Sequence, residues 1–108
     1  TYNFICCLAG TVNTLAQLGL LLIASPPPLR LNHCQFVQAI MSNCGLYEAS
    51  EHFFQQVGFP SKSGVSGIFL ALVPHQGAIA VYSPPLDVQG NCYAGLLLTS
   101  QIAQWLQE

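Results

Sequence analysis

The order of helix and strand signals predicts an α+β fold, with helices first, an antiparallel pair of strands next and a terminal helix that covers the sheet. An uncharged amphipathic stretch occupies positions 4–24. Two apolar runs at 64–73 and 78–82 flank a Pro-His-Gln-Gly turn, which is typical of a hairpin. Apolar residues then recur at helical spacing through positions 92–107, which predicts the last helix.

The first helix is predicted from a face of six residues at helical spacing, with Thr11 as its N-cap and the Ser25 to Pro28 segment as its end. The face consists of Val12, Leu15, Ala16, Gly19, Leu22 and Ile23. The uncharged stretch is long enough to raise the alternative of a membrane span. Asn13 and Gln17 interrupt it and no basic residue flanks its start, so a buried helix is favoured.

The later elements follow from turn residues and apolar spacing. We expect a helix at 34–42, a turn at Cys44-Gly45, a short helix at 50–56 and a loop at 83–91. The helix at 34–42 has Phe36, Val37, Ile40 and Met41 on one side. The expected apolar face of the last helix consists of Leu96, Leu97, Ile102, Trp105 and Leu106.

Composition predicts part of a larger domain. Hydrophobic residues make up 52% of the 108 positions and charged residues only 6%, a low charged share for a small soluble domain. Such a balance is expected where apolar faces pack against a segment outside these residues. The net charge of −2, with Arg30 and Lys62 far apart, excludes the basic surface that nucleic acid binding requires.

The five cysteines favour free thiols in a reducing, cytoplasmic compartment, because their number is odd and no Cys-x-x-Cys is present. A zinc site made from His33, Cys34, Cys44 and His52 is the less favoured alternative, since no pair has ligand spacing. We therefore expect neither a metal nor a cofactor. All three histidines, including His75, are expected on loops or exposed helix faces.

The tetrapeptide Lys62-Ser63-Gly64-Val65 is the strongest functional signal, because it contains the only lysine of the chain. At a strand edge, the lysine supplies a positive field, the serine a short hydroxyl, and the glycine a close backbone approach that lets the Val65 N–H reach an oxyanion. Lys-Ser/Thr-Gly on a strand is typical of serine β-lactamases and penicillin-binding proteins. The alternative for an isolated lysine is a solvated surface position.

Three longer motifs in order resemble those of the glutaminase family, serine-dependent amidohydrolases with a β-lactamase-like fold. Residues 44–48, Cys-Gly-Leu-Tyr-Glu, match Cys-Gly-Met-Tyr-Asp. Residues 57–65 contain Val-Gly-x-Pro-x-Lys-Ser-Gly-Val unbroken, and residues 83–91 contain Ser-Pro-Pro-Leu-Asp-x-x-Gly-Asn. Tyr2 with Cys6-Cys7 loosely resembles Tyr-x-x-x-Cys-Ser. The resemblance implies the C-terminal portion of a β-lactamase or penicillin-binding-protein-like domain.

The resemblance also implies an activity, the hydrolysis of L-glutamine to L-glutamate and ammonia through a serine acyl-enzyme. It assigns substrate contacts to Tyr2, Tyr47 and the Val65 backbone, and supporting catalytic roles to Lys62 and Ser63. The alternative for Tyr47 is a half-buried aromatic with a wet hydroxyl. The 83–91 loop is expected to be structural.

No Ser-x-x-Lys occurs in the 108 residues, so we expect residues 1–108 to form a partial glutaminase domain that is inactive alone. A non-catalytic remnant or interaction module of the same fold is the alternative, and an unrelated apolar helical protein is a distant third. Departures from the family pattern favour divergence; they are Cys7, Glu48, Glu51, Ile68, Cys92 and Ala94. We expect no nucleic acid or membrane partner, and the resemblance allows a homo-oligomer once the domain is complete.

Overall fold

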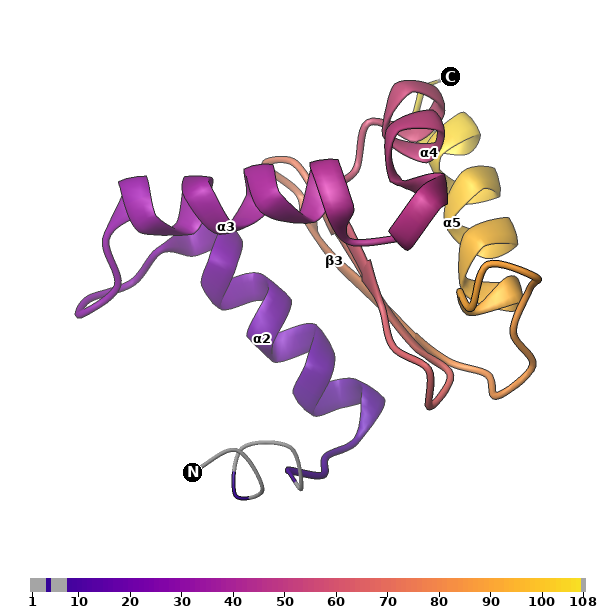
Figure 1. The fold of residues 1–108 in the computed structure, drawn as a ribbon. Helices are drawn as coiled ribbons and strands as arrows, with labels where there is room; N and C mark the ends of the chain where they lie inside the picture. The colour runs from indigo at the N-terminus through magenta and orange to yellow at the C-terminus, as the bar shows by residue number, and fades with distance from the viewer. Residues whose placement is uncertain (1–3, 5–7, 108) are drawn as a thin grey trace.

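The computed structural model describes Phe4 and residues 8–107. Its elements are α2 (Val12–Ala24), α3 (Leu31–Cys44), the 3₁₀ turn η1 (Tyr47–Ala49), α4 (Ser50–Val57), β1 (Ser61–Ser63), β2 (Ile68–Val73), β3 (Gly77–Tyr82) and α5 (Tyr93–Leu106). Helices therefore precede an antiparallel sheet and a final helix follows it (Figure 1), which confirms the predicted α+β class. Tyr2, a predicted substrate contact, lies outside the described residues.

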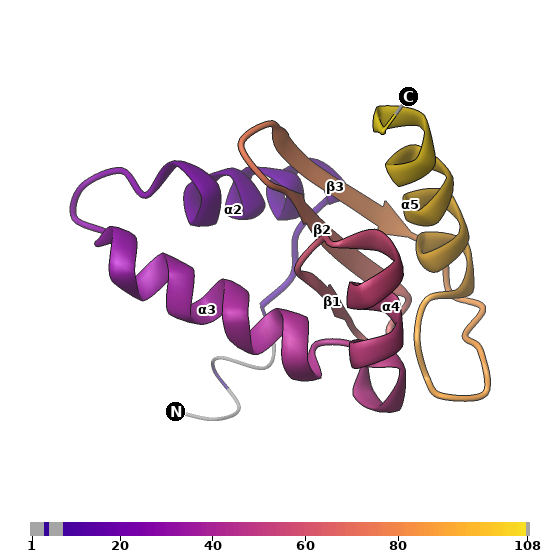
Figure 2. The same ribbon diagram turned by 90° about the horizontal axis from the view of Figure 1, so that it is seen from above.

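The three strands form one antiparallel sheet in the order β1-β2-β3, with α2 on one face and α4 and α5 on the other (Figures 1 and 2). The alternation of side chains along β2 explains these layers. Leu70 and Leu72 pack with residues of α2 and with Met41 of α3. Phe69, Ala71 and Val73 point to the opposite face, where they join the main core.

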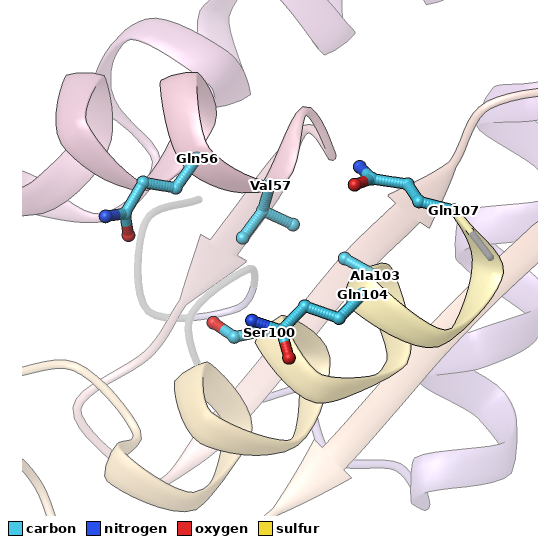
Figure 3. Close-up of a pocket in the computed structure, with 6 residues that line it drawn as sticks. All are labelled: Gln56, Val57, Ser100, Ala103, Gln104 and Gln107. Carbon is cyan, nitrogen blue, oxygen red and sulfur yellow. The ribbon is translucent and has the colours of Figure 1, made fainter.

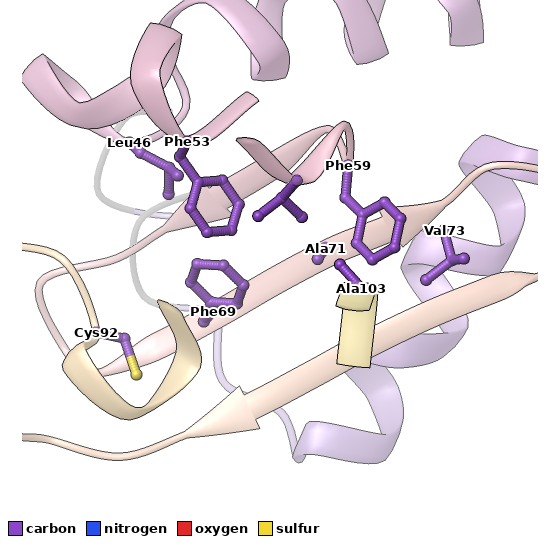
Figure 4. Close-up of a cluster of buried hydrophobic side chains, with 9 residues drawn as sticks. Leu46, Phe53, Phe59, Phe69, Ala71, Val73, Cys92 and Ala103 are labelled. Carbon is purple, nitrogen blue, oxygen red and sulfur yellow. The ribbon is translucent and has the colours of Figure 1, made fainter. Parts of the chain in front are cut away.

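The main core lies between β2, α4 and α5, and Figure 4 shows its side chains meeting there. Phe53 of α4 meets Phe69 of β2 edge to face, with ring centroids 6.2 Å apart and planes at 79°. Such aromatic pairs contribute about 0.5–1.5 kcal/mol beyond the area that they bury. The core thereby fixes α4, and with it the segment before α4, against the sheet.

The first helix confirms its prediction at both ends. Thr11 is the N-cap, and its hydroxyl accepts a hydrogen bond from the Thr14 N–H at 3.1 Å. Ser25 ends α2 in the left-handed conformation, immediately before the prolines. Gly19 is the buried residue of the helix, and a Cβ there would lie 2.7 Å from the Ala78 side chain, so the glycine allows α2 to approach β3 closely. Among the described residues, the helices fall short of the length and apolar character needed to cross a bilayer.

The prediction of one strand at 64–73 is wrong. Lys62 lies on a separate short strand, β1, which turns back through residues 64–67 and pairs with β2. The turn is closed by hydrogen bonds from the Gly64 N–H to the Ile68 carbonyl and from the Gly67 N–H to the Gly64 carbonyl, both at 3.0 Å. Gly67 has φ +103°, which glycine adopts readily. Within the described residues, the sheet therefore has three strands rather than a pair.

The predicted apolar face of the last helix is also mostly wrong. Leu97, Trp105 and Leu106 are exposed, and only Leu96 and Ile102 are partly covered. The buried residues of α5 are the small Gly95, Thr99 and Ala103. A Cβ on Gly95 would lie 2.6 Å from the Phe69 ring, so these small residues let α5 pack directly on β2.

The remaining boundaries differ by a few residues from the predictions. The helix predicted at 34–42 begins at Leu31 and ends at Cys44, and Gly45 is its C-cap. Its Met41 is buried, whereas Phe36, Val37 and Ile40 are exposed. The short helix extends one residue beyond 50–56 to Val57, and the last helix begins after its N-cap, Cys92.

Candidate active site

Three segments distant in sequence meet at the outer edge of β1, and hydrogen bonds join them. We call them the motif cluster: residues 44–50, residues 61–67 and residues 83–92. The Ser63 N–H donates to the Gly45 carbonyl at 3.1 Å. The Asn91 Nδ2 donates to the Leu46 carbonyl at 2.9 Å, and the Cys92 N–H donates to the Ser63 Oγ at 3.0 Å. Each sequence motif thus contacts the other two.

Gly45 allows the closest of these approaches. A Cβ at this position would lie 1.9 Å from the Ser61 carbonyl oxygen and 2.6 Å from the Met41 carbonyl oxygen. Both neighbours are main-chain atoms, which cannot move aside as the end of a flexible side chain can. Glycine is therefore required where the end of α3 touches β1, and this requirement gives the Cys-Gly motif a physical meaning.

The backbone of Tyr47 has an uncommon conformation, which hydrogen bonds from a neighbouring side chain stabilise. Its φ is +56°, in the left-handed region that non-glycine residues seldom occupy. The Ser50 Oγ accepts a hydrogen bond from the Leu46 N–H and donates one to the Tyr47 carbonyl, both at 2.8 Å. One buried hydroxyl thus ties the peptide before Leu46 to the peptide after Tyr47. The Tyr47 side chain remains 47% exposed.

Lys62 and Tyr47, both predicted site residues, lie side by side. The Lys62 Nζ is 5.3 Å from the centroid of the Tyr47 ring and donates to the Ser63 carbonyl oxygen. A cation over an exposed aromatic face contributes about 0.5–1 kcal/mol. The pair therefore presents a positive charge and a phenol together on the surface, which suits a small ligand that carries a carboxylate or a carbonyl.

Ser63, predicted to have a supporting catalytic role, lies in the interior of the protein. Its side chain is fully buried, and its Oγ accepts the hydrogen bond from the Cys92 N–H at the start of α5. Side chains alternate along β1, so Ser61 and Ser63 are buried while Lys62 is exposed. The hydroxyl thus joins β1 to α5 and is not the exposed ligand-facing group that the tetrapeptide suggested.

Val65 lies in the turn that follows β1, and its side chain is 71% exposed. Within residues 8–107, its backbone N–H donates to no main-chain acceptor. An unengaged N–H in an exposed turn is available to an oxygen of a ligand. Among the described residues, the predicted donor thus has no main-chain acceptor, and it lies three positions after Lys62 in the sequence.

The 83–91 loop forms a compact turn, in agreement with the structural role predicted for it. The Asp87 Oδ1 accepts hydrogen bonds from the Gln89 N–H at 2.9 Å and from the Asn91 N–H at 3.0 Å. Gly90 has φ +90° and lies near the Tyr47 side chain, since a Cβ at Gly90 would be 3.9 Å from the ring atom Cε2. The loop thus reaches the Tyr47 side chain as well as its backbone.

Other surface features lie away from the motif cluster. A pocket of about 310 Å³ between α4 and α5 is lined by residues outside the cluster (Figure 3); they are Gln56, Val57, Ser100, Ala103, Gln104 and Gln107. Within the described part of the chain, no group of three His, Cys, Asp or Glu residues could hold a metal ion. His33, His52 and His75 are all exposed, as predicted.

Sequence reasoning missed the residues that hold the site together. Ser50 was predicted only as a helix residue, Asn91 only as part of a stiff loop, and Gly45 only as part of a turn. Gly45 and Asn91 both lie inside the quoted motifs, so the signal for them was present. Ser50 lies outside the motifs, and its spacing of three residues from Tyr47 indicates only a local cap.

A profile of the glutaminase family matches residues 1–107. The chain is 46% identical over 107 residues to a glutaminase of Synechocystis sp., an alignment that covers 97% of this chain and 33% of that protein. It is 48% identical over 73 residues to glutaminase 1 of Halalkalibacterium halodurans, covering 68% of this chain and 24% of the relative. The chain therefore spans about a third or less of the length of these relatives.

Solved structures of glutaminases are similar to this chain in fold as well as in sequence. A Bacillus subtilis glutaminase in a covalent complex with 5-oxo-L-norleucine, formed by reaction with 6-diazo-5-oxo-L-norleucine, superposes with a TM-score of 0.83 and 32% identity, covering 91% of this chain and 38% of that one. A Bacillus glutaminase crystallised in the presence of 4.3 M NaCl superposes equally well, with a TM-score of 0.83 and 37% of its chain covered.

Proposed function

Since this chain belongs to the glutaminase family, we propose that it forms one wall of an active site that hydrolyses L-glutamine to L-glutamate and ammonia. In this proposal residues 1–108 are a partial glutaminase domain, and the serine nucleophile with its lysine belongs to a separate part of the domain. The proposal rests above all on the motif cluster, because it brings the amine of the exposed Lys62 to 5.3 Å from the centroid of the exposed Tyr47 ring.

The proposed reaction passes through a serine ester. The serine hydroxyl attacks the side-chain amide carbon of glutamine, the C–N bond breaks, and the nitrogen leaves as ammonia after it gains a proton. Water then adds to the ester, releases glutamate and restores the serine. A negative charge develops on the carbonyl oxygen at each tetrahedral stage, and nearby donors lower both barriers.

The residues of this chain receive roles that fit their exposure. Lys62 supplies a positive charge next to the reacting carbonyl or the substrate carboxylate, and the Val65 N–H donates to the oxyanion. Tyr47 contacts the substrate with its phenol. Tyr2 is assigned a second substrate contact because it matches the tyrosine of the Tyr-x-x-x-Cys-Ser motif. Ser63 supports the site from the interior, by joining β1 to α5 through its bond with the Cys92 N–H.

We also place the complete protein in the cytoplasm, in glutamine metabolism, where a homo-oligomer would be compatible with the domain. The cytoplasmic assignment is supported by cysteine chemistry, since Cys34, Cys44 and Cys92 are free thiols in the structure. No residue of the motif cluster needs an oxidising environment for its geometry.

A chimera tests the proposal. The matched third of the Synechocystis relative is replaced by this chain, and glutamine hydrolysis is measured by ammonia release beside the intact relative. We expect the chimera to hydrolyse glutamine and this chain alone to release no ammonia above background. A folded chimera without activity would contradict the proposal and favour a non-catalytic member of the family.

Covalent labelling adds a readout that does not depend on turnover. The probe is 6-diazo-5-oxo-L-norleucine, with which the Bacillus subtilis relative reacts. We expect a mass increase on the chimera and none on this chain alone. Labelling of this chain alone, abolished by Ser63→Ala, would show that Ser63 acts as a nucleophile and would contradict the assigned roles.

A further inference from the structure

Asn91 is anchored from several directions and is fully buried. Its backbone N–H donates to the Asp87 Oδ1 at 3.0 Å, and its carbonyl accepts from the Asp87 N–H at 2.8 Å. Its side-chain Nδ2 donates to the Leu46 carbonyl at 2.9 Å, across 45 positions of sequence. Its Oδ1 is buried without a partner among the described residues. Of the two side-chain polar atoms, Nδ2 is therefore the one that makes a hydrogen bond.

The Leu46 carbonyl determines the position of Tyr47. This carbonyl and the Tyr47 N–H belong to one planar peptide, so a bond to the oxygen fixes the plane from which Tyr47 projects. Ser50 holds the Leu46 N–H on one side and the Tyr47 carbonyl on the other. The Leu46 carbonyl lies between these two groups along the backbone, and Asn91 donates a hydrogen bond to it. The three hydrogen bonds together keep Tyr47 in its left-handed conformation.

The residues on either side of Asn91 act on the same pair of site residues. Gly90 lies near the Tyr47 side chain, since a Cβ at Gly90 would be 3.9 Å from the ring atom Cε2. Cys92 donates its N–H to Ser63, the neighbour of Lys62 on β1. Of the three successive residues 90–92, Gly90 therefore lies near the Tyr47 side chain, Asn91 bonds to the carbonyl before Tyr47, and Cys92 bonds to the strand that carries Lys62.

We infer that Asn91 is a positioning residue that holds Tyr47 beside Lys62 through the Leu46 carbonyl. The catalytic value of this pair rests on the proposed function, but its geometry does not. The experiment therefore measures the geometry directly, without turnover, so that a failure of the inference can be told apart from a failure of the proposed reaction.

The single lysine makes the measurement specific. Biosynthetic labelling with ¹³C-lysine gives signals from Lys62 alone. Because the Lys62 amine lies over the Tyr47 ring, we expect the ε-methylene protons to be shifted upfield and to show a nuclear Overhauser effect to the ring. Tyr47→Leu removes the ring and gives the reference position for an unshifted signal.

Asn91→Ala and Asn91→Asp are the test variants. Alanine removes both the donor and its volume, whereas aspartate keeps the shape and loses the donor to the Leu46 carbonyl. We expect both to move the Lys62 signal toward its position in Tyr47→Leu and to remove the Overhauser effect. Thr99→Val is the matched control: Thr99 is equally buried, its hydroxyl has no partner in the described structure, and it lies on α5 outside the motif cluster. This control should leave the signal unchanged.

Either of two results would overturn the inference. One is a folded Asn91→Ala protein whose Lys62 signal stays at the wild-type position. The other needs no variant and so remains decisive if both variants fail to fold: wild-type spectra in which the Asn91 side-chain amide shows no Overhauser contact with residues 45–47 and exchanges freely with solvent. If the Lys62 signal responds as expected and the chimera is inactive, the positioning role stands and the proposed reaction fails.

Discussion

The motif cluster and the outer surfaces of α3 and α5 are built on opposite principles. In the motif cluster, buried polar groups from three segments hydrogen-bond to one another, and glycines permit close main-chain contacts. On the outer surfaces, large apolar side chains stand in solvent, among them Phe36 at 66% exposure and Trp105 at 75%.

This difference separates the part of the structure that contacts within the chain stabilise from the surfaces that need an additional contact for their stability. The geometry of the motif cluster depends on bonds within the chain, so it is expected to form wherever the fold forms. The exposed apolar surfaces gain stability only from contact with other molecules or with a further part of the domain. The following predictions test that division, from the largest expected effect to the smallest.

Gly45→Ala should have the largest effect, because the new Cβ would overlap main-chain atoms of β1 and α3. We expect the free energy of unfolding to fall by roughly 3 kcal/mol, measured by urea denaturation. Gly77→Ala is the matched control, since a Cβ there meets no atom within 4 Å. Equal effects of the two changes would show that the motif cluster is not closely packed.

Lys62→Ala in the chimera should lower kcat/KM about a hundredfold, because loss of a charge beside a developing oxyanion costs a few kcal/mol. Steady-state ammonia release measures the change. His52→Ala serves as the control: His52 is exposed on α4, and we expect its loss to leave the rate nearly unchanged. A larger effect at His52 than at Lys62 would mean that the motif cluster is not the active site.

Val65→Pro and Val65→Ala separate a backbone role from a side-chain role in the same chimera. Proline removes the N–H, so we expect a loss of about tenfold or more, whereas alanine keeps the N–H and should be mild. The comparison is made on kcat, with circular dichroism to confirm that both proteins are folded. Equal losses would assign the effect to the valine side chain and end the oxyanion assignment.

Thr99→Val should stabilise the chain by about 1 kcal/mol, since it replaces a buried hydroxyl that has no partner in the described structure with a methyl group of similar size. Urea denaturation again measures the change. Destabilisation by a similar amount would show that the hydroxyl has a donor or acceptor after all, such as an ordered water.

Trp105→Glu should have the smallest effect on stability, within about 0.5 kcal/mol, because Trp105 is exposed on α5. We nevertheless expect it to lower self-association of the chain, which sedimentation velocity detects. Leu96→Glu, at a partly buried position packed against the core, is the contrasting change and should destabilise the fold. A wild-type chain that already sediments as a monomer would remove the need for a partner on this surface.

The sequence predicted α2 well because its signals are local. Thr11 caps it, Ser25 and the prolines end it, and every residue of its predicted apolar face except the exposed Val12 is buried or partly buried. The three motifs were likewise sufficient to bring Tyr47 and Lys62 into one predicted site. The cap, the prolines and the apolar spacing of α2 can be recognised without knowledge of the rest of the fold.

The failures at β1 and α5 arise from packing between distant segments. Apolar spacing on α5 indicates which residues favour burial, but the side that is buried is decided by how closely the helix approaches Phe69, and small residues permit the closest approach. The burial of Ser63 was not evident from the sequence because its partner, the Cys92 N–H, is 29 positions away. The role of Asn91 depends on a carbonyl 45 positions away, and the Asn-Gly composition of a loop does not reveal such a partner.

The bond from Asn91 to the Leu46 carbonyl has a consequence for sequence drift. Every residue type presents a main-chain carbonyl, so position 46 can change during evolution without loss of this bond. Here leucine stands where the resembled motif has methionine, and the bond is intact. Position 91 has no such freedom, because its side chain makes the contact. This hydrogen bond therefore constrains the side chain only at position 91, whereas the side chain at position 46 is constrained by packing, since Leu46 is 1% exposed and belongs to the main core.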